Sequence, residues 1–299
     1  MTNPIYILGS SNTDMVIKSD RLPAPGETLL GGTFLMNAGG KGANQAVAAA
    51  RLGGVVTLVT RVGNDLFGKQ SIEQFEKENI NTKFVSVDDN APSGVALINV
   101  DVKGENCIVV APGANGQISP QTLESFFKEL KSPSMVLVQL EIPIATVEYI
   151  IEECSKRNVS VILNPAPANS IRESSLKKLF AITPNETETQ LLTGIQIHDS
   201  KSTMQAASVL HQNGVQKVII TLGKQGAYWS DGINSAFLKS PVVTAVDTTA
   251  AGDCFNGALI VALAEGKSLE AAVTFACHAA SISVTRMGAQ ASMPFRKEL

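Results

Sequence analysis

The stretch Asp247-Thr248-Thr249-Ala250-Ala251-Gly252-Asp253 runs directly into Cys254-Phe255-Asn256-Gly257-Ala258-Leu259. It joins a carboxylate to a turn of small residues at a helix start, because residues 255–266 follow an apolar, helix-compatible pattern that ends in glycine. Free backbone N–H groups and the helix dipole attract anions there. Asp253 would accept the proton of a hydroxyl that attacks a terminal phosphate. The stretch indicates a phosphoryl-transfer site; an Asp-capped helix after a loop is the alternative.

A second glycine-rich stretch, Asn37-Ala38-Gly39-Gly40-Lys41-Gly42-Ala43-Asn44, also precedes an apolar helical pattern. It is not a Walker A loop, because glycine rather than Ser or Thr follows the lysine. The first strand-like run leads into Gly9-Ser10-Ser11-Asn12, which lacks the dinucleotide fingerprint and argues against an oxidoreductase. Flexible backbone, one ammonium group and two amides suit a polyhydroxylated ligand. A glycine-rich surface turn is the alternative.

Together these two stretches resemble the signature regions of the ribokinase-like (PfkB) carbohydrate kinases, and the resemblance extends over almost the whole chain. Further family marks occur in the expected order: Asn12-Thr13-Asp14, Glu141, Asn185-Glu186-Thr187-Glu188, Thr221-Leu222-Gly223-Lys224-Gln225-Gly226 and Val284-Thr285-Arg286-Met287-Gly288-Ala289-Gln290. The resemblance implies an ATP-dependent sugar kinase that forms a single domain, residues 1–299.

Strand-like and helix-like apolar runs alternate along the chain, for example in 135–140, 146–156, 159–163, 204–211 and 217–222. This rhythm predicts parallel strands with crossover helices on both faces. With the resemblance, the expected fold is α/β: a three-layer α/β/α, ribokinase-like (Rossmann-like) core with a mostly parallel central sheet. Ligands of such sheets bind beyond the carboxyl ends of the strands. Polar candidates that follow strand runs are therefore expected at one edge: Asn12, Glu141, Asn164, Asn185 and Gly223.

Two segments break the alternation, because they are rich in β-branched or short apolar residues and have no helix between strands. They predict a small separate sheet from about residues 13–36 and 93–110. The resemblance implies that this sheet is a lid over the sugar and clasps a second subunit in a homodimer. Ala96, Ile98 and Val110 would then cover the site and exclude water. A plain hairpin excursion is the alternative.

The resemblance implies a role for each residue that matches a family position. Asp253 is the base, and the backbone amides of Ala250, Ala251 and Gly252 hold the transferring phosphate as an anion hole. The sugar is bound by Asn12, Asp14, Gly40, Lys41, Asn44, Ala96, Ile98, Glu141 and Asp253. The nucleotide is bound by Asn185, Glu188, Thr221, Gly223, Gly226, Gly252 and Cys277.

Two cations are implied in the same way. Asn185 and Glu188 would organise Mg²⁺ largely through water, because this ion keeps several waters in such sites; a helix cap after Pro184 is the alternative. A monovalent cation, preferably K⁺, would activate the enzyme beside the anion hole. Its candidate ligands are hard oxygen donors from Asp247, Thr249, Ser283, Arg286, Gly288 and Ser292.

Composition argues for small-molecule partners. Lys and Arg total 24 against 27 Asp and Glu, without long runs of like charge, so neither a nucleic-acid nor a membrane-surface partner is expected. The N-terminal residues lack a signal-peptide pattern and no apolar run reaches membrane-spanning length, so a cytoplasmic location is expected. The four cysteines are scattered and the three histidines form no ligand-spaced cluster, which disfavours zinc chemistry.

The sequence constrains the reaction more closely than the substrate. The resemblance implies phosphorylation of D-ribose at O5, giving D-ribose 5-phosphate and ADP. Asn12 and Asp14 can satisfy adjacent hydroxyls, and a substrate lacking one would leave a buried polar group unpaired, which favours ribose over 2-deoxyribose. 2-Deoxyribose, fructose, pseudouridine and other nucleosides remain alternatives. A catalytically silent sugar-binding protein on the same fold is a further alternative.

Overall fold

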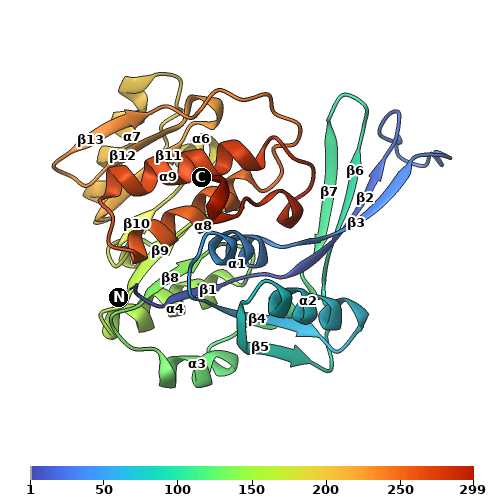
Figure 1. The fold of residues 1–299 in the computed structure, drawn as a ribbon, viewed down its shortest axis with the longest axis horizontal. Coiled ribbons are helices and arrows are strands. Elements are labelled where there is room, and N and C mark those ends of the chain that lie inside the picture. The colour runs from blue at the N-terminus through green and yellow to red at the C-terminus, as the bar shows by residue number, and fades with distance from the viewer. Residues whose placement is uncertain (1) are drawn as a thin grey trace.

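The computed structural model describes residues 2–299 and contains a nine-stranded central sheet in the order β13-β12-β11-β10-β9-β8-β1-β4-β5 (Figure 1). Within this order, the neighbouring strands β11, β10, β9, β8, β1, β4 and β5 all pair in parallel. At the other end of the sheet, β12 pairs antiparallel with β11, and β13 pairs antiparallel with β12. Their bounds are β1 Ile5–Leu8, β4 Val56–Gly63, β5 Asn81–Asp88, β8 Met135–Val138, β9 Ser160–Leu163, β10 Ala181–Ile182, β11 Lys217–Thr221, β12 Ala227–Ser230 and β13 Ser235–Leu238.

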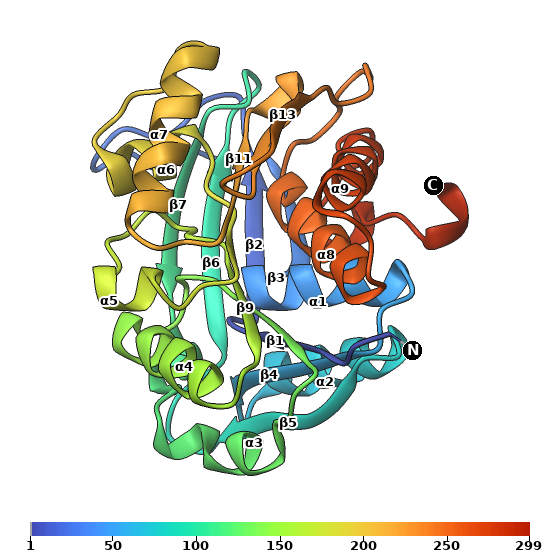
Figure 2. The ribbon, with the colours of Figure 1, turned by 90° about the vertical axis from the view of Figure 1, so that its left-hand side faces the viewer.

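Helices cover both faces of this sheet (Figure 2). One apolar cluster joins a sheet face to α1 Lys41–Arg51, α2 Leu66–Lys77, α8 Ala251–Ala264 and α9 Leu269–Ser283. The other joins the opposite face to α3 Glu124–Glu129, α4 Ile144–Lys156, α5 Glu173–Leu176, α6 Glu186–Thr193 and α7 Ser200–Gln212. Short 3-10 turns are η1 Gly113–Gln117, η2 Gln121–Leu123, η3 Gly223–Gln225, η4 Gln290–Ser292 and η5 Arg296–Glu298. The predicted three-layer fold is confirmed.

The inner strands are apolar on both sides because both of their faces are buried. In β1, Ile5 and Ile7 pack in the cluster beneath α1 and α8, whereas Leu8 packs in the cluster beneath α3 and α4. Buried parallel strands therefore give continuous apolar runs instead of alternation. No helix among residues 2–299 is both long enough and apolar enough to cross a membrane.

The predicted smaller sheet is present and projects from the core beside α1 and α2 (Figure 1). Its order is β3-β2-β6-β7, with β2 Asn12–Lys18, β3 Thr33–Gly39, β6 Gly94–Val100 and β7 Asn106–Ala111. The β2 and β6 strands are parallel, and each has an antiparallel outer partner. Because β2 continues from β1 and β3 leads into α1, the base of this sheet lies at the carboxyl edge of the central sheet.

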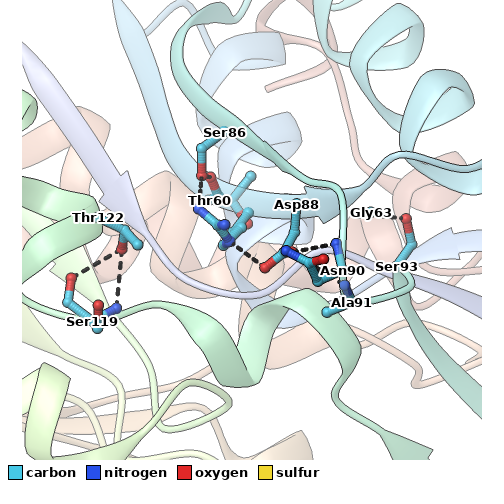
Figure 3. Close-up of polar contacts among 10 residues, drawn as sticks. Thr60, Gly63, Ser86, Asp88, Asn90, Ala91, Ser93, Ser119 and Thr122 are labelled. Carbon is cyan, nitrogen blue, oxygen red and sulfur yellow. Dashed lines mark hydrogen bonds and ion pairs between the residues drawn. The ribbon is translucent and has the colours of Figure 1, made fainter.

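Hydrogen bonds hold the connection from β5 to β6 in place where it enters the smaller sheet (Figure 3). The Ser93 hydroxyl accepts a hydrogen bond from the Gly63 N–H at 3.0 Å, and it donates one to Asp65 at 2.7 Å. The Asp88 carboxylate accepts hydrogen bonds from the N–H groups of Asn90 and Ala91 at 2.9 and 3.1 Å. These bonds satisfy backbone groups of an irregular segment and fix its path.

Candidate active site

Helices α1 and α8 bring the two glycine-rich stretches together. Gly257 makes this possible, because a Cβ at this position would lie 2.6 Å from Ala48 Cβ and 2.8 Å from the Gln45 carbonyl oxygen. Only glycine permits so close an approach of the two backbones. The second turn of α8 therefore packs against the second turn of α1. The hydrogen bond between Asn44 and Asp253 also connects the two stretches, and their joint role as one functional site stays a prediction.

Asp253 is the central residue of the site. Its side chain is 5% exposed, and two amides hold its carboxylate. Asn44 Nδ2 donates to Oδ2 at 3.0 Å, and Gln45 Nε2 donates to Oδ1 at 2.9 Å. Burial raises the pKa of Asp253, while the Lys41 charge and the two amide donors oppose this effect. The result is a carboxylate of fixed orientation that is more basic than an exposed aspartate.

The N-terminus of α8 presents uncommitted backbone donors. Ala250 precedes the helix in the left-handed region, with φ of 58°, an unusual conformation for a residue with a Cβ. The Ala251 N–H donates to the Thr248 carbonyl at 3.2 Å. The N–H groups of Ala250, Gly252 and Asp253 have no acceptor within residues 2–299. These donors and the helix dipole suit an anion, with Ala251 less available than the sequence suggested.

Acidic side chains surround Lys41 at the start of α1. The Glu141 carboxylate accepts hydrogen bonds from the Lys41 backbone N–H at 2.9 Å and from the Ser10 hydroxyl at 2.5 Å. Although burial opposes it, the charges of Asp253, Glu141, Glu188 and Asp14 raise the pKa of the Lys41 ammonium. Burial, followed by the charges of Glu141 and Asp253, raises the pKa of Asp14 to about 6. The ammonium therefore stays charged while Asp14 titrates close to neutrality.

The smaller sheet places the remaining candidates for sugar binding. Asn12 and Asp14 lie two residues apart on β2, so both side chains face the same side. Asp14 pairs with Ala96 across the sheet, and Val16 pairs with Ile98, so Ala96 and Ile98 share that face. Gly40 has a φ of 87°, and a Cβ there would lie 2.7 Å from the Asn12 backbone nitrogen. The candidates from the smaller sheet and from α1 are therefore adjacent.

Asn185 and Glu188 form a capping box at the start of α6. Asn185 Oδ1 accepts from the Glu188 N–H at 2.8 Å, and Glu188 Oε2 accepts from the Asn185 N–H at 2.9 Å. The helix cap considered as the alternative is thus the observed geometry. Burial raises the pKa of Glu188. Lys41 influences this pKa as well, which places Glu188 near the other acidic groups; a role in organising magnesium stays a prediction.

The nucleotide candidates near β11 lie at the same edge of the central sheet. The Thr221 N–H donates to the Pro184 carbonyl at 3.0 Å, which ties the end of β11 to the start of α6. Gly223 and Gly226 have positive φ values of 54° and 100°. A Cβ on Gly226 would lie 2.0 Å from the Leu238 carbonyl, so this glycine is required by the turn into β12. Cys277 is buried in the apolar cluster on α9, so its predicted contact with a nucleotide has no exposed side chain to make it.

The candidate cation ligands lie in two neighbouring segments next to α8. Asp247 Oδ1 accepts from the Thr249 N–H and Oδ2 accepts from the Gly288 N–H, both at 2.9 Å. Although partial burial opposes it, these hydrogen bonds lower the pKa of Asp247. The Ser283 carbonyl accepts from the Arg286 N–H at 3.1 Å. The Ser292 hydroxyl donates to the Ala289 carbonyl at 2.8 Å, and cation binding by this group stays a prediction.

Sequence reasoning missed two residues of the site. Gln45, in the first half of α1, donates to Asp253 and also to Asn164 Oδ1 at 3.0 Å. Asn115, which lies in η1 after β7, donates to Asn12 Oδ1 at 2.8 Å. A polar residue at a helical position does not by itself indicate a carboxylate partner on another helix, so no local signal identified Gln45. Nothing local distinguishes Asn115 from an ordinary loop residue.

The four cysteines are unpaired, and three of them are buried. Cys254 adjoins Asp253 in the first turn of α8. Burial raises the pKa of the Cys254 thiol to about 12. The thiolate that reacts with oxidants is therefore rare at neutral pH, and the residue packs as a small apolar group.

Comparisons with known proteins agree with this geometry. The pfkB family carbohydrate kinase model matches residues 3–296. The chain is 43% identical to the ribokinase of Haemophilus influenzae, over 100% of this chain and 97% of the relative. It is 37% identical to a deoxyribokinase of Salmonella typhi, over 97% of this chain and 95% of the relative.

A solved structure shares both the fold and the sequence. The ribokinase of Arabidopsis thaliana, complexed with ribose and ATP, superposes with a TM-score of 0.90 at 34% identity. The match covers 99% of this chain and 97% of the plant protein. The match to the family across nearly every residue, and the paired stretches that meet at Asp253, lead to one conclusion: the chain belongs to the pfkB family of carbohydrate kinases.

Proposed function

We propose that the protein transfers the terminal phosphoryl group of ATP to O5 of D-ribose, giving D-ribose 5-phosphate and ADP. The observation that carries this proposal is the buried Asp253 carboxylate at the N-terminus of α8, beside free backbone N–H groups. A base and an anion site in the same helical turn are what an attacking hydroxyl and a transferring phosphate need.

Asp253 removes the proton of the attacking hydroxyl. Its raised pKa makes it a better base than an exposed aspartate, and the donors Asn44 and Gln45 keep it ionised. The N–H groups of Ala250, Gly252 and Asp253 stabilise the charge on the phosphate, and the dipole of α8, which begins at Ala251, adds to this stabilisation. Positioning of the two reactants in line supplies most of the remaining acceleration.

The sugar lies between α1 and the smaller sheet in this proposal. Polar groups for its hydroxyls come from Asn12, Asp14, Gly40, Lys41, Asn44 and Glu141, and Ala96 and Ile98 cover it. Asn44 Oδ1 is buried without a partner among the described residues, and Asn44 Nδ2 donates to Asp253. The ribokinase relatives support ribose. The deoxyribokinase relative makes 2-deoxyribose the first alternative to test.

ATP is placed along the carboxyl edge from β10 to α8, at Asn185, Glu188, Thr221, Gly223, Gly226 and Gly252, and the buried Cys277 is left out of this site. Mg²⁺ neutralises phosphate charge when bound, and Glu188 would hold it through water, since both of its oxygens already accept hydrogen bonds. The donor set for K⁺ fits a hard monovalent ion: the Asp247 carboxylate with oxygens of Thr249, Ser283, Arg286, Gly288 and Ser292.

A homodimer through the smaller sheet is part of the proposal. Ile17, Phe34, Met36, Leu97 and Val109 are exposed, and strand alternation puts them on the face opposite Ala96 and Ile98. A contiguous apolar face of this kind suits a second copy of the chain. Light scattering after size exclusion should report a dimer, and Val109→Glu should shift it toward a monomer.

The unpaired cysteines suit a reducing compartment, and we place the protein in the cytoplasm.

Product analysis tests the reaction directly. Phosphorus NMR of a reaction with ribose, ATP, Mg²⁺ and K⁺ should show one new phosphomonoester on C5, coupled to the C5 protons. A product phosphorylated at C1, or no product, would reject the assignment to O5. The silent sugar-binding alternative predicts that calorimetry detects binding of ribose but no binding of ATP. Calorimetry with each ligand therefore distinguishes a kinase from a sugar-binding protein.

A further inference from the structure

Asn115 lies where three chain segments meet at the base of the smaller sheet. It belongs to η1, which follows β7, and its side chain is 1% exposed. The N–H of the preceding Ala114 donates to the Pro92 carbonyl at 2.8 Å, which ties η1 to the connection before β6. Its side chain bonds to Ser11 and Asn12, where β1 passes into β2. Asn115 therefore links three of the four places where the chain passes between the core and the smaller sheet.

The backbone of Ser11 fixes the orientation of the Asn115 amide. The Ser11 N–H can only donate, and it points at Asn115 Oδ1 over 2.9 Å. The Ser11 carbonyl can only accept, and it lies 3.0 Å from Asn115 Nδ2. A flipped Asn115 amide would face donor against donor and acceptor against acceptor. The polarity of this side chain is thus set by main-chain groups, which cannot rotate to suit it.

The Asn115 amide in turn fixes the orientation of the Asn12 side-chain amide. The second hydrogen of Asn115 Nδ2 is donated to Asn12 Oδ1 at 2.8 Å. Asn12 must therefore keep its carbonyl oxygen toward Asn115 and its NH₂ group away from it. Asn12 Nδ2 has no hydrogen-bond partner in the described part of the chain, although the side chain is only 6% exposed. The Asn12 side chain is therefore held so that its free polar group is the hydrogen-bond donor Nδ2.

Gly94 encloses the bond between the two asparagines. A Cβ at this position would lie 2.2 Å from Asn12 Oδ1 and 2.3 Å from Asn115 Nδ2. The β6 backbone therefore packs directly on the hydrogen bond, and leaves no room there for a water molecule to replace either partner. An enclosed hydrogen bond is stronger than an exposed one and costly to leave unmade.

We infer that Asn115 is a specificity-determining positioning residue, which fixes Asn12 so that it offers an N–H donor, and no acceptor, to the sugar. This inference rests on the proposed function. Asp14 follows on the same face and offers acceptors when ionised. A substrate hydroxyl then accepts from Asn12 Nδ2 while its neighbour donates to Asp14. A sugar without one of these hydroxyls leaves Asn12 Nδ2 or Asp14 unpaired.

A double-mutant cycle between Asn115→Leu and Asn12→Ala tests this inference. KM and kcat are measured for ribose and 2-deoxyribose in the parent, both single variants and the double variant. Asn115→Leu should raise KM for ribose about 10- to 100-fold, the loss expected for one buried hydrogen bond, with kcat nearly unchanged. In the Asn12→Ala background the same change should raise KM less than about threefold, because the group it positions is already absent. The preference for ribose over 2-deoxyribose should fall with Asn115→Leu.

Two further variants distinguish a loss of positioning from a general loss of folding stability. Asn115→Ser leaves a smaller donor and should show the same coupling in a milder form. Thr146→Val is the matched control, because Thr146 is buried and donates to the Ile118 carbonyl at the end of η1 at 2.8 Å, without contact to Asn12. It should lower the melting temperature and leave the sugar preference unchanged.

Effects of Asn115 and Asn12 that multiply independently would overturn the inference, as would an unchanged sugar preference in Asn115→Leu. Failure of the proposed function is seen separately, as a parent that does not phosphorylate ribose. The cycle is then run on whichever of 2-deoxyribose, fructose or pseudouridine the parent phosphorylates, or on sugar binding by calorimetry if it phosphorylates none. Coupling on that sugar would still support the positioning role, and independence would reject it.

Discussion

Gln45 Nε2 lies 2.9 Å from Asp253 Oδ1 and donates a hydrogen bond to this carboxylate from a completely buried side chain. The same nitrogen donates to Asn164 Oδ1 at 3.0 Å, and the side-chain oxygen Gln45 Oε1 accepts from Gln139 Nε2. Because Gln139 fixes the Gln45 amide, both Gln45 hydrogens point at acceptors. The orientation of the base is therefore determined by a polar network inside the core.

Replacing Gln45 by Met should move the pH dependence of the reaction. A donor favours the ionised carboxylate, so its loss raises the pKa of Asp253 and leaves the base protonated over more of the acidic range. The acidic limb of kcat/KM should shift upward by about one pH unit, the size expected for one hydrogen bond to a charged group. The measurement is a pH–rate profile with saturating ATP. An unshifted limb with a uniformly lower rate would show that Gln45 only maintains structure.

Asp14 should show opposite effects on stability and activity. Its pKa is raised from 3.8 to about 6, so the folded state binds this proton more tightly than the unfolded chain does. Stability from Asp14 is thus fully present below about pH 3.8 and is lost as the pH rises through about 6. Asp14→Asn should therefore melt higher than the parent at pH 8, with a smaller gain at pH 4.5, while KM for the sugar rises. A lower melting temperature at pH 8 would contradict this account.

The fold and much of the site could be predicted from the sequence because the relevant signals are local. Buried parallel strands read as apolar runs, and the helix after Asp253 is marked by small residues and a periodic pattern. The two glycine stretches could be joined only through the family resemblance. Their contact depends on Gly257, whose neighbour Ala48 lies more than 200 positions earlier in the chain.

The positions of Gln45 and Asn115 could not be predicted for a related reason. The hydrogen-bond partners of Gln45 and Asn115 are buried side chains and main-chain groups on other elements. The identity of one polar residue in the sequence does not indicate which distant group it will bind. The Asn185 and Glu188 pair shows the converse, because S/T/D/N followed three residues later by Glu is a local capping signal and the cap is present. Local chemistry was readable, whereas long-range polar pairing was not.

Gly257→Ala should separate α1 from α8. Its Cβ would meet Ala48 Cβ at 2.6 Å and the Gln45 carbonyl at 2.8 Å, so one helix must shift. Overpacking of this kind costs about 1–3 kcal/mol, and the shift should also weaken the contacts to Asp253 and lower kcat. Thermal unfolding and turnover measure the two effects. Ala at Gly252 is the control for stability, because a Cβ there meets nothing within 4 Å, so Gly252→Ala should melt no lower than the parent.

Potassium should raise turnover relative to sodium. The segment that carries Asp247 and Thr249 precedes the anion site directly, so a cation held there would fix the free N–H groups that follow. Rates at equal ionic strength in KCl and NaCl measure the effect, and Asp247→Asn should reduce it. Equal rates in the two salts would reject a cation role for Asp247, Thr249, Ser283, Arg286, Gly288 and Ser292.

The most direct test of the central claim is ribose-dependent release of ADP with Mg²⁺ and K⁺, measured for the parent and for Asp253→Asn. The variant keeps the size of the side chain and removes the proton acceptor, so turnover should fall by about 100- to 10,000-fold while circular dichroism and ATP binding are retained. A folded Asp253→Asn protein that releases ADP at the parental rate would contradict the assignment of the base, and with it the account of the site.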